Sequence, residues 1–147
     1  NVQGDEPLIK AEDITKIIKT KIKHPNKIIC GYTNLGKNEN HLNTNIPKLV
    51  VNLRNELIYI SRSSIPAMKI NKINKVFLKQ VCIYAFNKEE LKNFYSNKKT
   101  PLEKLEDIEI LRFLEKGKKI QMVKLSSGSH AVDRKSDIKI VEKRLRK

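Results

Sequence analysis

The stretch Phe77-Leu-Lys-Gln-Val-Cys-Ile-Tyr-Ala-Phe86 carries the strongest strand signal in the chain. Its apolar residues Val81, Ile83 and Ala85 occupy every second position. Because successive side chains of a strand point to opposite faces, this alternation places a row of apolar side chains on one face. The stretch is therefore predicted to be a strand, and the segments on either side of it add further strands and helices.

The flanking segments alternate between helical and extended patterns. A helix is expected over residues 11–23, ended by Pro25, because isoleucines recur at helical spacing at Ile14, Ile17, Ile18 and Ile22. Asn55 separates two strand-like runs and predicts a hairpin or two neighbouring strands. Asn87 is expected to cap a short helix that ends at Tyr95. The other expected elements are strands over residues 27–33, 47–54, 56–62 and 119–125 and a final helix capped by Ser136. This order predicts a mixed α/β fold in a single domain, residues 1–147.

A longer helix is expected to begin at Pro101. Thr100 would be its cap, Glu103 would complete a capping box, and Gly117 would close it. Its apolar face would consist of Leu102, Leu105, Ile108, Leu111 and Leu114. A stripe of charged residues lies beside that face, at three-residue spacing: Glu103, Glu106, Glu109 and Arg112. We interpret it as ordinary pairing of charged side chains on the surface.

Composition indicates a soluble globular protein. The 147 residues are 39% hydrophobic and 32% charged, and no apolar run approaches the ~18 residues of a membrane-spanning helix. The start of the chain lacks the pattern of a signal peptide. Cys30 and Cys82 each fall in an expected strand, and we interpret both as small buried hydrophobes in a reducing cytoplasm. A cytoplasmic protein without a membrane partner is expected.

The net charge of +15 raises the alternative of a basic nucleic-acid-binding module. The excess is mostly lysine spread along the whole chain, and aromatic residues make up only 5%. Base-stacking surfaces need aromatic side chains, so this composition favours no nucleic-acid partner. The nucleic-acid reading stays open as the alternative from another class of protein.

Two carboxylates stand at expected strand ends. Asp5 lies in the opening segment Gln3-Gly4-Asp5-Glu6-Pro7, which is also typical of a surface turn in which Gly4 supplies backbone freedom. Asp133 follows a second extended segment. Two aspartates from separate strand ends, with water and phosphate oxygens, are a common way to hold Mg²⁺. The segment is therefore either a turn or half of a magnesium site.

Three polar residues on expected strands are candidates for binding a substrate. Arg62 ends a strand, where its guanidinium either clamps a carboxylate or is an exposed terminal charge. Gln80 and Tyr84 are four residues apart, so they share one face of their strand. They either hydrogen-bond sugar hydroxyls or form the solvated side of a half-buried strand.

Six motifs in order resemble the CMP-Kdo synthetases, the 3-deoxy-manno-octulosonate cytidylyltransferases. They are Asn1-Val2-Gln3-Gly4-Asp5-Glu6-Pro7, Asn43-Thr44-Asn45-Ile46-Pro47-Lys48, Tyr59-Ile60-Ser61-Arg62-Ser63-Ser64-Ile65-Pro66, Ile83-Tyr84, Thr100-Pro101-Leu102-Glu103 with Glu109 and Leu111-Arg112, and Ala131-Val132-Asp133. The resemblance covers the whole chain but only the C-terminal portion of the family's length. It implies a mixed-sheet, Rossmann-like nucleotide-diphospho-sugar transferase fold that is truncated at its N-terminus.

The resemblance also implies an activity and its residues. Asp5 and Asp133 would be catalytic as ligands of the cofactor Mg²⁺. The substrates would be CTP and an acidic eight-carbon sugar, Kdo or its 8-amino variant, joined with release of pyrophosphate for lipopolysaccharide biosynthesis. A homodimer or higher self-association is expected. The sugar would be bound by Gln3, Arg62, Gln80, Tyr84 and Glu109, with Arg62 meeting its carboxylate.

Departures from the family pattern concern the sugar and the nucleotide. Gln80 stands where many members carry histidine, and Ile110 where glutamine is common, which points toward the 8-amino sugar. Arg134 and Lys135 replace the usual Thr-Pro after Asp133. A CMP-sialate-type synthetase for a nine-carbon acidic sugar is the alternative within the enzymes. The family's CTP-gripping segment would precede Asn1, so the 147 residues alone are expected to release little pyrophosphate from CTP; measurable release would contradict this.

Overall fold

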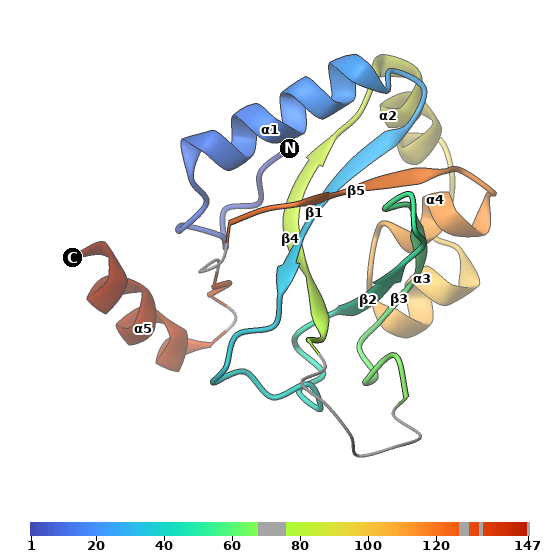
Figure 1. Cartoon of the computed structure of the whole chain (residues 1–147). Coiled ribbons are helices and arrows are strands. Elements are labelled where there is room, and N and C mark those ends of the chain that lie inside the picture. The colour runs from blue at the N-terminus through green and yellow to red at the C-terminus, as the bar shows by residue number, and fades with distance from the viewer. Residues whose placement is uncertain (68–75, 127–129, 133, 147) are drawn as a thin grey trace.

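The computed structural model describes residues 1–67, 76–126, 130–132 and 134–146. Within this part, the strands form a five-stranded mixed sheet in the order β3-β2-β4-β1-β5 (Figure 1). The strands are β1 (Ile28–Asn34), β2 (Lys48–Val51), β3 (Leu57–Ser61), β4 (Leu78–Ala85) and β5 (Ile120–Lys124). The stretch that opened the sequence analysis is β4, the middle strand of this order, and it pairs antiparallel with both β1 and β2. β5 is parallel to β1.

The helices are α1 (Ala11–Lys23), α2 (Lys88–Tyr95), α3 (Pro101–Glu106), α4 (Leu111–Glu115) and α5 (Lys135–Leu145). Helix α1 packs on one face of the sheet and the α2–α4 region on the other, whereas α5 lies to the side (Figure 1). The alternation in β4 divides its side chains between two cores. Val81 and Ile83 pack with Ile17 of α1 on one face. Tyr84 packs with Leu111 and Phe113 of α4 on the other. The predicted mixed α/β pattern is confirmed.

Single residues in the sequence predicted several ends of helices and strands correctly. Asn55 adopts a left-handed backbone conformation (φ 56°) in the turn between the antiparallel strands β2 and β3. Gly117 is left-handed after α4 (φ 70°). The Asn87 side chain accepts a hydrogen bond from the Glu90 backbone N–H at 2.8 Å, and the Glu90 carboxylate accepts from the Asn87 N–H at 2.7 Å. This reciprocal capping box begins α2 as expected.

The prediction of a single long helix after Pro101 is wrong. The chain forms α3 and α4 instead, because Asp107 takes a left-handed conformation (φ 49°) that ends α3 after six residues. The break turns Leu105 out to solvent, where it is 81% exposed, while Ile108 and Leu111 are buried. Periodicity alone did not reveal this break, since Asp tolerates the left-handed region without a glycine signal.

Two further helix predictions need correction. Ile18 and Ile22 are exposed, so the apolar contact of α1 is made chiefly by Ile17 and partly by Ile14. The final helix begins at Lys135, with Arg134 rather than Ser136 at the N-cap position. The Arg134 N–H donates to the Asp137 carboxylate at 2.7 Å. No helix in the described part is long and apolar enough to cross a bilayer.

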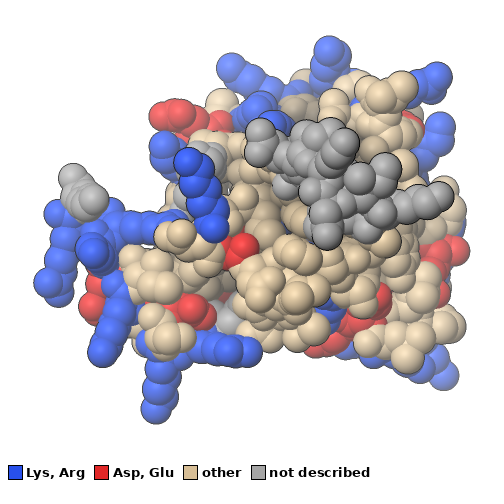
Figure 2. Space-filling view, turned by 60° about the horizontal axis from the view of Figure 1, so that its bottom comes forward, with Lys and Arg blue, Asp and Glu red and all other residues tan. Residues whose placement is uncertain are grey.

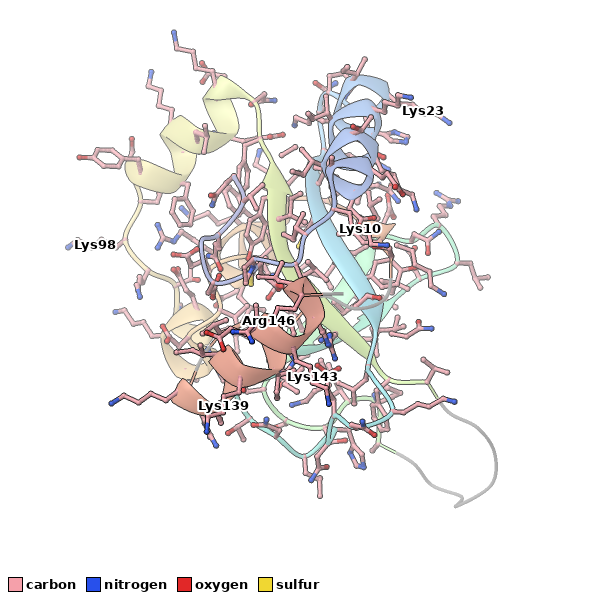
Figure 3. The ribbon with its side chains drawn as sticks, turned by 90° about the vertical axis from the view of Figure 1, so that its left-hand side faces the viewer. Lys10, Lys23, Lys98, Lys139, Lys143 and Arg146 are labelled. Atoms are coloured by element: carbon pink, nitrogen blue, oxygen red, sulfur yellow. The ribbon has the colours of Figure 1, made fainter. Side chains whose placement is uncertain are left out.

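Basic side chains come from many elements. Figure 3 places Lys139, Lys143 and Arg146 on α5, with Lys10 and Lys23 at the two ends of α1 and Lys98 on the segment between α2 and α3. In Figure 2 the Lys and Arg side chains are densest at the left of the view, over α5. The excess charge is thus distributed over the surface, with its highest density on the last helix.

Gly31 is the glycine at which a side chain would collide with the core. A Cβ there would lie 2.6 Å from both Ile83 Cγ2 and Leu125 Cδ1. Gly31→Ala is therefore expected to lower the free energy of unfolding by about 1–3 kcal/mol through overpacking. Gly4→Ala is the matched control, because a Cβ at Gly4 meets nothing within 4 Å, and it is expected to change stability by less than about 0.5 kcal/mol. Urea denaturation of both variants measures the difference, and equal midpoints would refute the close approach.

Candidate active site

A polar cavity of about 370 Å³ opens along β4 and the segments that meet it. Every predicted site residue within the described part lies on its wall: Gln3, Asp5, Arg62, Gln80, Tyr84 and Glu109. These residues come from the first five positions, the end of β3, β4 and the break between α3 and α4. Tertiary structure therefore brings together residues that are more than 100 positions apart.

The opening segment reaches the cavity because it pairs with β4. The Asn1 amino group donates to the Tyr84 carbonyl at 2.9 Å, and the Tyr84 N–H donates to the Asn1 carbonyl at 2.8 Å. The Gln3 N–H donates to the Cys82 carbonyl at 3.0 Å. The Cys82 N–H then donates to the Glu6 carboxylate at 3.3 Å. Extended pairing followed by a turn thus fixes this segment beside Tyr84.

Asp5 lies in this turn, which is closed by a 3.2 Å bond from the Glu6 N–H to the Gln3 carbonyl. Gly4 makes no use of a left-handed conformation here, so its expected conformational role is wrong. Asp5 Oδ1 is buried, and within the described part of the chain it has no hydrogen-bond partner. A buried carboxylate oxygen of this kind requires a cation or a hydrogen-bond donor, which a water molecule or a ligand can supply.

Asp133 lies outside the described residues. The position before it is described: the Val132 N–H donates to the Asp5 carbonyl at 2.8 Å. Arg134, the position after it, lines the cavity. Among the residues that the structure describes, His, Cys, Asp and Glu do not form a group of three suited to a metal ion.

Gln80 and Tyr84 share a face as predicted, and Gln80 Nε2 donates to the Tyr84 hydroxyl at 3.0 Å. Both are only 7% exposed, so the interpretation of this face as a solvated strand side is wrong. Burial raises the pKa of Tyr84 well above its ordinary value of 10.0. The hydroxyl is therefore neutral; it accepts from Gln80 and also has a side-chain hydrogen bond with Cys82. Sulfur is a weak acceptor, so a ligand oxygen can take the Tyr84 proton in place of the thiol.

Arg62 is oriented by three backbone carbonyls. Its Nε donates to Glu106 O at 2.5 Å, one terminal nitrogen to Thr44 O at 3.0 Å, and the other to Asp107 O at 3.0 Å. A guanidinium has five N–H groups, so each terminal nitrogen keeps one donor. Two parallel donors match the two oxygens of a carboxylate.

The predicted stripe of surface ion pairs along one helix is wrong. Glu103 is 1% exposed and forms a bidentate pair with Arg112, at 2.6 Å and 2.5 Å. Glu106 accepts from the Ser61 hydroxyl at 2.6 Å. Glu109 lines the polar cavity. The break at Asp107 rotates the three glutamates away from a common stripe and gives each a different environment.

Several cavity residues were not singled out from the sequence. Lys79 Nζ pairs with Glu39 Oε1 at 2.5 Å. His130 lies between carboxylates, with ring nitrogens 3.8 Å from Glu39 and 3.5 Å from Asp137. All four line the cavity. Glu39 lies in an asparagine-rich loop, Lys79 in a strand, His130 in the segment before the last helix and Asp137 in that helix, and no spacing in the sequence links them.

Cys30 and Cys82 are both free. Cys30 is buried as predicted, whereas Cys82 is only partly buried and lies on the cavity wall. Burial raises the pKa of the Cys30 thiol to about 12 and also raises that of Cys82, with the Glu6 carboxylate as the next cause. Both side chains are therefore neutral thiols, which is unfavourable for nucleophilic chemistry.

A second, smaller cavity of about 170 Å³ adjoins the first. Tyr84 and Glu109 line both cavities. The remaining wall of the second cavity is mainly apolar and includes Phe86, Phe94, Phe113, Leu91 and Ile110. Ile110, one of the departures from the family pattern, therefore lies next to Glu109 on the wall of the second cavity.

A solved structure and a family model show to which class of protein this chain belongs. A solved structure titled as CMP:2-keto-3-deoxy-manno-octonic acid synthetase complexed with CTP superposes with a TM-score of 0.87 at 27% identity, over 99% of this chain and 60% of that one. The protein thus has the nucleotide-diphospho-sugar transferase fold. The cytidylyltransferase family model matches residues 1–120, and the chain belongs to that family.

Curated relatives agree with this assignment. The mitochondrial 3-deoxy-manno-octulosonate cytidylyltransferase of Arabidopsis thaliana is 35% identical over 99% of this chain and 51% of its own length. The 3-deoxy-manno-octulosonate cytidylyltransferase of Thermodesulfovibrio yellowstonii is 35% identical over 97% of this chain and 58% of its own length. The chain therefore spans little more than half of these relatives.

Proposed function

We propose that this chain provides the sugar-binding and metal-binding part of a 3-deoxy-manno-octulosonate cytidylyltransferase. The observation that carries the proposal is the buried Asp5 Oδ1, which has no partner among the described residues and lies in a cavity that Arg62, Tyr84 and Glu109 also line. The names of the similar proteins support CTP and an eight-carbon acidic sugar as substrates. The product is a CMP-sugar of the kind used for lipopolysaccharide.

The residues of the cavity suit the acidic sugar. Each terminal nitrogen of Arg62 has a second N–H besides its bond to a carbonyl, and these would meet the sugar carboxylate, with the exposed Asp107 carboxylate 3.9 Å away as a competing partner. Tyr84 donates to a sugar hydroxyl while Gln80 fixes its orientation. Gln3 and Glu109 provide further hydrogen-bonding groups on the same wall. In the proposed reaction the anomeric hydroxyl loses its proton and attacks the α-phosphate of CTP, and pyrophosphate leaves as the bond between the α- and β-phosphates breaks. These contacts serve to align that hydroxyl.

Asp5 and Asp133 are the proposed magnesium ligands. Asp5 fits this role because an unpartnered buried carboxylate oxygen is the hard, anionic ligand that Mg²⁺ prefers. Asp133 is proposed on its sequence position, between Val132, which is bonded to Asp5, and Arg134 on the cavity wall. Bound Mg²⁺ would offset phosphate charge and favour deprotonation of the attacking hydroxyl.

The contacts at the far end of the sugar decide which acidic sugar is bound. Gln80 and Ile110 replace residues that are common in the family; Gln80 lines the polar cavity, and Ile110 lies next to Glu109 on the wall of the second cavity. A carboxylate beside an apolar wall favours a cationic amine over a hydroxyl. This supports the 8-amino sugar, with Kdo and a nine-carbon sialate as the alternatives.

Sugar binding tests the proposal directly on the 147-residue protein. Addition of Kdo or its 8-amino variant is expected to shift the backbone NMR resonances of Arg62, Tyr84 and Glu109. Arg62→Gln should weaken binding about tenfold or more, because a bidentate charge-assisted pair is lost. Arg54→Gln, an exposed arginine beside the β2–β3 turn, should bind like the wild type. Stronger binding of a nine-carbon sialate would favour the other synthetase class, and binding of none of these sugars would refute the proposal.

The proposed cytoplasmic location and self-association rest on separate observations. Two free, neutral thiols suit a reducing compartment. At the edge of the described sheet, Ile58 of β3 is 55% exposed, and Leu53 in the preceding turn is fully exposed. An exposed apolar edge strand favours pairing with a second copy.

A further inference from the structure

Two charged side chains hold the backbone of Arg62 from opposite sides. The Arg62 N–H donates to Glu106 Oε2 at 2.8 Å. The Arg62 carbonyl accepts a hydrogen bond from Lys48 Nζ. Both peptide units next to this arginine therefore have charge-assisted hydrogen bonds, which are stronger than bonds between neutral groups.

Lys48 is an unusual residue for the interior of a sheet. It is fully buried, with 0% exposure, on β2. Burial lowers the pKa of its ammonium, the nearby Arg62 lowers it further, and Glu106 opposes the shift. A buried ammonium is costly unless acceptors surround it. Besides the Arg62 carbonyl, Nζ donates to the Asn43 carbonyl at 2.8 Å.

The Asn43 contact extends this support to the loop that orients the guanidinium. Asn43 and Asn45 line the polar cavity. Thr44, between them, provides the carbonyl that accepts from one terminal nitrogen of Arg62. Lys48 thus ties the arginine backbone to the same loop whose carbonyl fixes the arginine side chain.

Glu106 completes the arrangement from the other side. Its carboxylate accepts from the Arg62 N–H and the Ser61 hydroxyl, and its own carbonyl accepts from Arg62 Nε. Between them, Lys48 and Glu106 contact the arginine at its N–H, its carbonyl and its Nε. The two terminal N–H groups that remain are aimed by this framework.

We infer that Lys48 and Glu106 are positioning residues that set the Arg62 guanidinium for recognition of a substrate carboxylate. The inference rests on the proposed function, in which Arg62 binds the carboxylate of the sugar. Neither residue needs to touch the sugar. Their effect is expected on selectivity for the acid, because Arg62 is the proposed partner of the carboxylate and a neutral group forms no charge-assisted pair with it.

The test compares two ligands on the folded 147-residue protein, Kdo and its neutral methyl ester, by calorimetry. The wild type is expected to prefer the acid by about tenfold or more. Lys48→Met and Glu106→Gln should each reduce this preference to about twofold or less. A substitution that only loosened the fold would weaken binding of both ligands alike and leave their ratio unchanged, which would overturn the inference.

Three controls separate the possible outcomes. Lys27→Met removes another strand-end lysine with two hydrogen bonds, to Glu56 and Gln121, outside the cavity, and should keep the wild-type ratio. If Arg62→Gln leaves the preference intact, the proposed function fails. If Arg62→Gln abolishes it while Glu106→Gln preserves it, the positioning inference alone fails. Glu106→Gln also decides the question if Lys48→Met does not fold, as judged by circular dichroism.

Discussion

Asp5→Asn is expected to lower the affinity of the 147-residue protein for Mn²⁺, used as a paramagnetic substitute for Mg²⁺, by at least about 100-fold. The substitution preserves the size of the side chain and removes its charge. Residues that only support a metal ligand typically change affinity 10–100-fold, and the loss of a ligand itself is expected to have at least that effect. Among the described residues, Asp5 Oδ1 has no hydrogen-bond partner that would compete with the metal.

Asp107→Asn is the matched control for this experiment. Asp107 lines the same cavity, but its side chain is 80% exposed and only 3.9 Å from the Arg62 guanidinium. Asparagine tolerates the left-handed conformation of Asp107, so the fold should be preserved. Line broadening by Mn²⁺ in NMR spectra should be retained in Asp107→Asn and lost in Asp5→Asn. Equal broadening in both variants would exclude Asp5 as a ligand.

Arg112→Met is expected to lower the free energy of unfolding by about 3–5 kcal/mol, the typical cost of leaving a buried charge without its partner. Arg112 makes two bonds to Glu103 and donates to the Phe94 and Asn97 carbonyls at 2.8 Å and 3.1 Å. Its guanidinium also lies 3.8 Å from the centre of the Phe94 ring. One side chain thus joins α2, α3 and α4 behind the site.

The double variant Glu103→Leu with Arg112→Met tests why Arg112→Met loses stability. If the cost arises from the orphaned carboxylate, removal of both charges should restore much of the lost stability. If it arises from lost packing and backbone bonds, the double variant will be no more stable than Arg112→Met. Thermal melts followed by circular dichroism distinguish the two, since about 3 kcal/mol corresponds to roughly 10 °C for a domain of this size.

Acid should weaken the same pair. The hydrogen bond from Arg112 holds the pKa of Glu103 below its ordinary value of 4.5. The stabilisation is therefore complete above that value and is lost as the pH falls through the lowered pKa. The Glu103→Gln variant should lack this component, so its stability should fall less than that of the wild type below pH 4.5.

Local sequence patterns predicted the elements well where the signal was short-range. The alternation in β4, the cap at Asn87 and the turn at Asn55 depend on neighbouring residues, and all three are confirmed. The continuous helix after Pro101 failed because its apolar spacing persists across the break at Asp107. The burial of Glu103 was missed for the same reason, since its partner Arg112 reaches it only after that break.

Some residues of the candidate site were found from the sequence, and others only from the structure. Asp5, Arg62 and Glu109 were found through motifs that resemble a family, and the structure places them on one cavity wall. Asp133 lies outside the described residues and stays a prediction. Lys48 was not identified as a candidate, because a lysine in a strand is normally expected to be exposed, and only the folded chain shows its two carbonyl partners.

The sequence by itself determined the α/β class, the strand faces and the family, because periodicity, caps and ordered motifs are encoded over a few residues. Only the tertiary structure decided which polar groups share an environment. Asp5 became a candidate ligand through an unpartnered buried oxygen, and Gln80 became a buried support for Tyr84. Burial and hydrogen-bond geometry depend on segments distant in sequence, such as Asn1–Gln3 and β4, which meet only when the sheet forms.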